Sequence, residues 1–346
     1  MWEKKLLLVA VAAGSVLLTG CGPVKLADTA PAPLLETVVM PTKAELKAQM
    51  SGQGTKIILS PVEYSDNHAK DFTSEVYEDL SQRLLKSGNT LVDRTLAAKL
   101  KNELLAAESS GKYRTSGPAV ADIAIMTKIS EVGLTSRFSE SRSWVDDDGE
   151  KHKIEASCRF ESTAELNVRA YKIPSMELIN TYEYEGSSSS STETRNSKCP
   201  ISDASASTLV SRALQDAVKS GSFETLNDLA PDAYVIERRD NEDSSKALFQ
   251  VTISKRAGAV EGATVKFYRK SIDVTPITNE ERVRKTLLGE GEIIAEDINE
   301  QTSYVYVKDK ELIESLQMGD IAQLEHGKCD ADETQVFGSC VKIPGI

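Results

Sequence analysis

The feature that most constrains this chain of 346 residues is a strict alternation of side-chain polarity between Ala156 and Tyr171. Every second residue from Ala156 is small or apolar, with one serine, and the residues between are almost all polar or charged. Successive side chains of a β-strand point to opposite faces, so this segment predicts a long strand with one buried face and one wet face. Pro174 and Ser175 predict a turn into a partner strand, Glu177–Tyr184, followed by a loop from Ser187 to Cys199.

Helical periodicity flanks this meander. Phe72, Val76, Leu80 and Leu84 recur every four residues and predict an amphipathic helix, with Gly88 as its left-handed cap. Further helices are predicted from about Leu96 to Ala107 and over 203–220, the latter ending at Gly221. With strands at 57–62, 90–92 and 122–138, the order of elements over residues 55–230 predicts an α/β (α+β) sandwich.

Beyond Pro231 the helical period largely disappears. Short strand-like runs separated by glycine and charge follow, at 233–237, 247–253, 263–269, 291–298, 303–307 and 321–324. This pattern predicts a small all-β, barrel-like domain over residues 231–346, in which Gly289-Glu290-Gly291 is a turn at the start of a strand.

The N-terminus indicates export. Lys4 and Lys5 precede an apolar run of fifteen residues, Leu6–Gly20, which is shorter than the roughly twenty residues that span a bilayer. Residues 1–20 therefore read as a signal peptide. Leu17–Cys21 resembles a bacterial lipobox, in which the chain is cut before the cysteine and the cysteine is acylated. The resemblance implies lipid attachment at Cys21, and Gly22 in place of aspartate favours the outer membrane over the inner one. The alternative is a plain signal peptide with an incidental cysteine.

Residues 21–54 combine small residues with four prolines, Pro23, Pro31, Pro33 and Pro41, and lack a sustained period. This composition is typical of an extended tether, with at most a short helical turn near Ala44–Met50. The protein is accordingly expected to lie on the periplasmic face of the outer membrane, held by its acyl chains and separated from them by the tether.

Without Cys21, four cysteines remain, an even number that suits disulfides in an oxidising compartment. Four cysteines allow three pairings. Cys329 and Cys340 are eleven positions apart in a polar tail and are paired here, which leaves Cys158 with Cys199. The competing interpretation, a metal or thiol site, lacks a C-x-x-C motif and has only three scattered histidines.

No enzymatic motif is recognisable. The chain has no P-loop, dinucleotide fingerprint, H-E-x-x-H or G-x-S-x-G motif, so we predict no catalytic residue, cofactor or small-molecule substrate. Its net charge of −12 also speaks against a nucleic-acid partner. The cluster Asp146–Asp148 offers carboxylates to Ca²⁺ but misses the EF-hand spacing, and Asp148-Gly149 favours a hairpin turn, so no metal ligand is predicted there.

The order of elements resembles the curli-secretion-channel lipoprotein (CsgG-like) family over residues 56–221. The resemblance is carried by Pro61 after the opening strand, Asp93-Arg94 before the second helix and Ala121-Asp122 at a strand start. Three further segments resemble the β domain that follows such folds, including that of the flagellar H-ring protein FlgT: 261–269, 288–293 and 318–321. The long apolar hairpins of the curli channel are not recognisable here.

This resemblance implies a non-enzymatic scaffold or ring component of an envelope assembly, flagellar or secretory, built from copies of itself or related subunits. Two alternatives remain open. One is an oligomeric secretion channel of the curli type, with barrel strands contributed by the meander. The other is a lipoprotein regulator of a cell-wall synthase.

Overall fold

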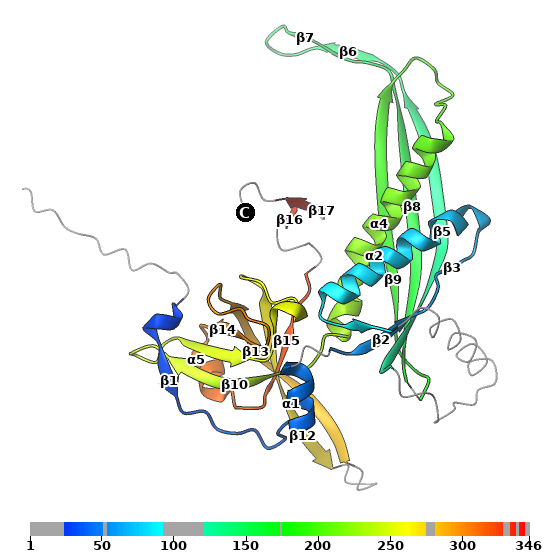
Figure 1. Ribbon diagram of the computed structural model, residues 1–346. Coiled ribbons are helices and arrows are strands. Elements are labelled where there is room, and N and C mark those ends of the chain that lie inside the picture. Colours follow the sequence, from blue (N-terminus) through cyan, green and yellow to red (C-terminus); the bar gives the residue numbers. More distant parts are fainter. Residues whose placement is uncertain are drawn as a thin grey trace, which may run out of the picture.

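The computed structural model describes residues 24–50, 54–92, 121–173, 175–274 and 281–327, together with the backbone of 333–336 and 339–342. The predicted signal peptide, Cys21, the predicted helix near Leu96–Ala107 and Cys329 lie outside these residues. Figure 1 shows an elongated α/β unit beside a smaller β unit. The fold class is the one expected, a mixed α/β domain followed by a closed antiparallel β-barrel.

One sheet forms the frame of the α/β unit, in the strand order β4-β2-β5-β8-β9 with β3 beside β5. Its strands are β2 (Lys56–Leu59), β3 (Glu63–Tyr64), β4 (Thr90–Leu91), β5 (Ile123–Ser139), β8 (Ser157–Lys172) and β9 (Glu177–Glu193). The short strands β2 and β3 run parallel to β5, whereas β5, β8 and β9 form a long antiparallel meander. The alternation of polarity between Ala156 and Tyr171 is confirmed in β8, whose even-numbered residues from Cys158 to Ala170 are all buried.

The predicted loop after Tyr184 is wrong at its start, because β9 continues through the serine run to Glu193. Serine is a weak strand former by itself, but the first seven residues of β8 pair with Ser187–Glu193 along the whole run. The backbone ladder with β8 therefore decides the structure of this segment, and the composition of the segment does not.

Two helices cover one face of the sheet: α2 (Thr73–Lys86), preceded by the 3₁₀ turn η2 (Asn67–Phe72), and α4 (Asp203–Asp228). The side chain of Ser202 caps α4 by accepting from the backbone N–H of Ser205. The predicted helix end at Gly221 is wrong, since α4 runs on by seven residues to Asp228. A Cβ at Gly221 would lie 2.4 Å from the ring of Tyr184, so glycine serves here for close packing of helix against strand.

The six barrel strands are β10 (Ala233–Asp240), β11 (Ala247–Val251), β12 (Thr264–Val274), β13 (Glu281–Ile293), β14 (Ser303–Val307) and β15 (Ile321–Leu324). They lie in the order β10-β11-β14-β13-β12-β15, and pairing between β10 and β15 closes the barrel. The short helix α5 (Lys310–Ser315) and the turn η3 (Lys255–Ala257) complete the unit. Its core contains Phe249 and Phe267, whose ring centroids are 6.3 Å apart.

The expected turn at Gly289–Gly291 is wrong, because both glycines lie inside β13. A Cβ at Gly291 would lie 2.7 Å from the carbonyl oxygen of Tyr306, so the glycine allows β14 to approach closely. Two small hairpins lie outside the main sheets: β6 (Arg142–Val145) with β7 (Lys151–Ile154), and β16 (Glu333–Val336) with β17 (Ser339–Lys342). Cys340 lies in β17, but the expected Cys329–Cys340 bond falls partly outside the described residues and is not tested by them.

Residues 24–50, here called the N-terminal strap, differ from the extended tether expected from their prolines. They contain the 3₁₀ turn η1 (Leu26–Asp28), the strand β1 (Ala30–Ala32) and the helix α1 (Lys43–Met50). The strand β1 pairs antiparallel with the end of β10, so the strap is part of the barrel sheet. None of the described helices is both long enough and apolar enough to cross a membrane.

Candidate anchoring and assembly surfaces

The N-terminal strap makes contacts along most of its length. At its start, Val24 and Leu26 pack against a buried cluster on the barrel, formed by Leu248, Ile294, Tyr304 and Tyr306. The backbone N–H of Leu26 donates to Glu296 Oε2 at 2.6 Å. Farther along, Arg239 donates through Nη2 to the carbonyl oxygen of Thr29 at 2.9 Å. These contacts hold the strap start on the barrel surface.

A second group of contacts fixes the middle of the strap. The backbone N–H of Thr37 donates to the carbonyl of Met318 at 2.9 Å, and the N–H of Met318 donates to the carbonyl of Leu35 at 2.7 Å. Leu34 packs into the barrel core. A capping box begins α1, since Thr42 and Glu45 exchange hydrogen bonds of 2.6 and 3.2 Å. The pattern Thr42-x-x-Glu45 is a helix-start signal that can be read from the sequence. Nothing in the sequence indicates that Arg239 and Met318 bond the strap.

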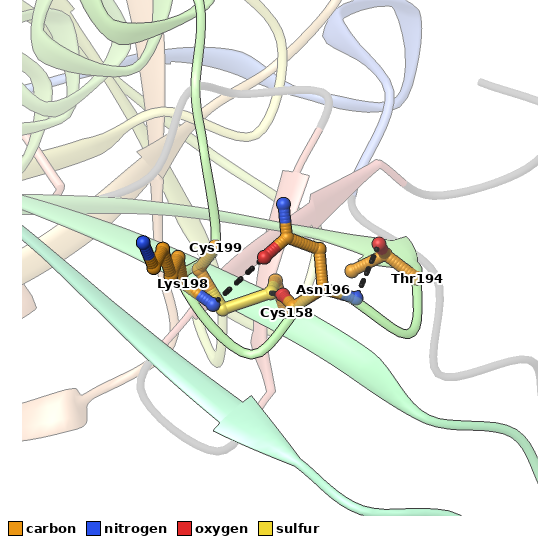
Figure 2. Close-up of a disulfide and its surroundings, with 5 residues drawn as sticks. All are labelled: Cys158, Thr194, Asn196, Lys198 and Cys199. Atoms are coloured by element: carbon orange, nitrogen blue, oxygen red, sulfur yellow. Dashed lines mark hydrogen bonds between the residues drawn. A yellow bond between two sulfur atoms is a disulfide. The ribbon is translucent and has the colours of Figure 1, made fainter.

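Cys158 and Cys199 form a disulfide in the structure, the pair left by the pairing of Cys329 with Cys340 (Figure 2). Their Cα atoms are 5.4 Å apart, within the range that such bonds require. Both residues are buried with Phe160 and Leu209. The bond fastens the loop before α4 to the start of β8, at the far end of the long meander.

Among the described strands β9 pairs with β8 alone, but α4 occupies part of its outer edge. The backbone N–H of Ser187 donates to Asp216 Oδ2 at 2.9 Å, and the carbonyl of Glu185 accepts from Ser220 Oγ at 2.8 Å. The edge is therefore open beyond Ser187, from Ser188 to Glu193, which at about 3.3 Å per residue is roughly 20 Å of backbone. On the opposite side of the sheet, β5 pairs with β2 and β3 only as far as Ile129. The distal half of β5, Glu131–Ser139, therefore presents a second open edge within the described part of the chain.

The two open edges flank faces of different character. On the face away from the helices, Glu131, Glu165 and Glu185 lie directly opposite one another across the three strands. Like charges in this position destabilise a sheet. Arg137 and Arg159 also lie opposite one another on this face, so it carries both signs of charge. On the face that carries the helices, Leu134 of distal β5 is 39% exposed, since α4 packs mainly against β8 and β9. The backbone groups that no strand of the described sheet uses lie at the two edges.

The hairpin of β6 and β7 ends in the turn formed by the predicted Asp146–Gly149 cluster. Asp146 Oδ1 accepts from the N–H groups of Asp148 and Glu150, and Asp146 Oδ2 lies 2.6 Å from His152 Nε2. The hydrogen bond with His152 is the main cause that lowers the pKa of the Asp146 carboxyl. One oxygen or nitrogen each of Asp146, Glu150 and His152 lie within 4.8 Å of one another. Because the carboxylate of Asp146 already bonds His152 and two backbone N–H groups of the turn, we assign these contacts to hairpin stability.

A groove of about 1390 Å³ separates α2 and α4 from the rim of the barrel. Its helix side carries both signs of charge: Asp79, Arg83, Lys86, Arg212, Asp216 and Lys219. Burial and the neighbouring Glu75 raise the pKa of Asp79. The barrel side includes Glu325, which binds Lys266 at 2.6 Å, and His326. With opposite charges interleaved, the groove favours neither anions nor cations.

His326 lies at the junction of the two units. Its backbone N–H donates to Asn227 Oδ1 at 2.7 Å, and its carbonyl accepts from Asn227 Nδ2 at 3.0 Å. Its ring atom Nε2 is buried and has no hydrogen-bond partner among the described residues. Desolvation by burial lowers the pKa of the ring to about 4. In the sequence, His326 is one of three scattered histidines, and nothing around it indicates this role.

No known family profile and no curated protein match the chain. Among solved structures, it is similar to a putative neuraminyllactose-binding hemagglutinin homolog from Helicobacter pylori, with 12% identity and a TM-score of 0.29 over 54% of this chain and 87% of that one. It is also similar to lipoprotein GNA1162 from Neisseria meningitidis, with 13% identity and a TM-score of 0.23 over 45% and 93% of the two chains. It is similar as well to the PelC dodecamer from Paraburkholderia phytofirmans, with 13% identity and a TM-score of 0.19 over 52% of this chain and 93% of that one. These similarities do not assign the chain to a family, so the curli-type resemblance stays a prediction from sequence.

Proposed function

We propose that the chain is an outer-membrane-anchored periplasmic lipoprotein that serves as a scaffold or ring component of an envelope assembly, without enzymatic activity. The observation that supports this proposal most is the pair of open edges, Ser188–Glu193 of β9 at one edge and distal β5 at the other edge of one sheet. An open edge presents unpaired backbone N–H and C=O groups that another strand can use.

The two edges differ, so contact between copies is head to tail. The β9 edge of one copy would pair with the distal β5 edge of the next, and repetition of such a contact closes into a ring when the rotation permits it. The β9 edge is rich in serine and glutamate, which keeps a dilute single copy solvated. Confinement by acyl chains at Cys21 raises the effective concentration, so weak edge contacts suffice.

The test is crosslinking of the full-length protein in the native envelope. The double variant Ser189→Lys with Ser191→Lys places two cations on the β9 edge, and we expect it to abolish the crosslinked multimers formed by the wild type. The matched control, Ser74→Lys with Ser207→Lys, makes the same charge change at exposed positions of α2 and α4 and should preserve them. Multimers that survive the edge variant would exclude this route of assembly.

A separate measurement addresses the anchor. Cys21→Ser should move the protein from the membrane fraction to the soluble periplasmic fraction, and the wild type should carry acyl mass at its mature N-terminus. Membrane partitioning that the substitution leaves unchanged would contradict the lipid anchor.

A further inference from the structure

We propose that the N-terminal strap clamps the β-barrel against the lipid surface that holds Cys21, so that the barrel is the membrane-proximal unit of the protein. This inference rests on the anchoring part of the proposed function. It replaces the long flexible spacer expected from the proline content with a short, fixed connection.

The strap is attached at three successive places. Leu26 binds Glu296 near its start, β1 pairs with β10 in its first half, and Thr37 bonds with Met318 in its middle. Leu26 and Leu34 also bury apolar surface against the barrel. Release of the strap would expose these side chains and leave the backbone groups of β1 without their ladder partners, which a free tether would not require.

The length of chain before the strap limits how far the barrel can move from the membrane. Cys21 precedes Val24 by three residues, and a fully extended chain covers at most about 3.6 Å per residue, so this connection spans roughly 11 Å. A free spacer over residues 21–54 would reach on the order of 100 Å at about 3.1 Å per residue. The strap thus reduces the greatest possible distance between Cys21 and the barrel by nearly an order of magnitude.

The surface around η1 indicates how the barrel meets the lipid. Lys25, Asp28, Glu296 and Asp297 are all exposed there, so the surface is polar and carries both charges. Burying such groups among acyl chains is costly. The partner is therefore the headgroup layer, with the barrel lying on it and not inserted, and three carboxylates to one ammonium group favour zwitterionic over anionic headgroups. Figure 1 shows η1 on the side of the barrel away from the α/β unit, so the barrel stands between the lipid and the open sheet edges.

Two matched insertions test the clamp in the lipidated full-length protein. One places eight glycine and serine residues between Pro23 and Val24, before the strap, and the other places the same residues between Met50 and Ser51, after it. A fluorescent amino acid is incorporated at the exposed Ala295, between Ile294 and Glu296, which both contact the start of the strap, or at Asp148, at the tip of the β6–β7 hairpin. The protein is bound to vesicles of phosphatidylethanolamine and phosphatidylglycerol that carry a headgroup-linked quencher.

We expect several-fold stronger quenching at Ala295 than at Asp148. The insertion before the strap should reduce quenching at Ala295, and the insertion after it should leave that quenching unchanged. Equal effects of the two insertions, or equal quenching at the two positions, would overturn the clamp even when the protein is vesicle-bound. Wild-type protein that does not bind the vesicles would instead overturn the anchor, and this proposal with it.

Discussion

Acidification between pH 6.5 and 4 is expected to destabilise the protein through His326. Burial lowers the pKa of this imidazole from 6.5 to about 4. In that pH window His326 is protonated in the unfolded chain and neutral in the folded chain. Stability therefore falls as the pH falls from 6.5, and the contribution of His326 is constant above 6.5 and below 4.

The size of the effect follows from the shift. Each pKa unit corresponds to about 1.36 kcal/mol, so the shift of His326 from 6.5 to about 4 amounts to about 3 kcal/mol of unfolding free energy. The described hydrogen bonds of His326 join its backbone N–H and carbonyl to the side chain of Asn227. His326→Gln therefore removes the titrating ring and leaves those bonds in place, which makes it the appropriate perturbation.

The assay is urea unfolding of the full chain carrying Cys21→Ser, monitored by circular dichroism at several pH values from 4 to 7. Wild type should lose about 3 kcal/mol more than His326→Gln across this range, by the conversion used above. His68→Gln, which removes an exposed imidazole, serves as the control and should follow the wild type. An identical pH dependence of wild type and His326→Gln would refute the reasoning.

Three further predictions concern stability and are checked by the same unfolding assay at pH 7. A Cβ at Gly186 would lie 2.2 Å from backbone atoms of α4, so Gly186→Ala should cost about 1–3 kcal/mol by overpacking, and an unchanged midpoint would contradict it. Arg269 binds the fully buried carboxylate of Asp320 at 2.7 Å, and Arg269→Met should cost about 3–5 kcal/mol by leaving that charge unpaired; a cost under about 1 kcal/mol would show that Asp320 finds other compensation. Replacing Cys158 and Cys199 together by serine opens a loop of 41 residues and should cost roughly 4 kcal/mol, and the variant should match wild type treated with reductant.

The elements that could be predicted from sequence are those whose own residues repeat with the period of a strand or a helix. The alternation in β8 and the four-residue period of α2 each identify a buried face without reference to any other part of the chain. Where the prediction failed, a distant partner decides the structure. Ser187–Ser191 is a strand because β8 is beside it. Gly221 lies within α4 and does not end it, because this glycine makes room for the ring of Tyr184.

The surfaces that carry the proposed function are the ones that the sequence indicates least. The prolines of the strap are typical of a tether, and its attachment depends on Arg239 and Met318, more than two hundred residues away. The lipobox residues, in contrast, form a local signal that needs no fold. The open edges could be anticipated from the meander, but their extent required the strand pairing of β5 with β2 and β3.

The long separation of the strap contacts has a consequence for the order of events during biogenesis. Leu26 and Glu296 are 270 positions apart, and Ala30 pairs with Asp240. Contacts of such high sequence separation form late, because the intervening chain must first be available and ordered. With the lipid anchor proposed above, the N-terminus of the chain is held at the membrane before these contacts form, and the barrel reaches the lipid only after Met318 is available and β10 has paired with β15. The height of the protein above the membrane would then be set only once the barrel has closed.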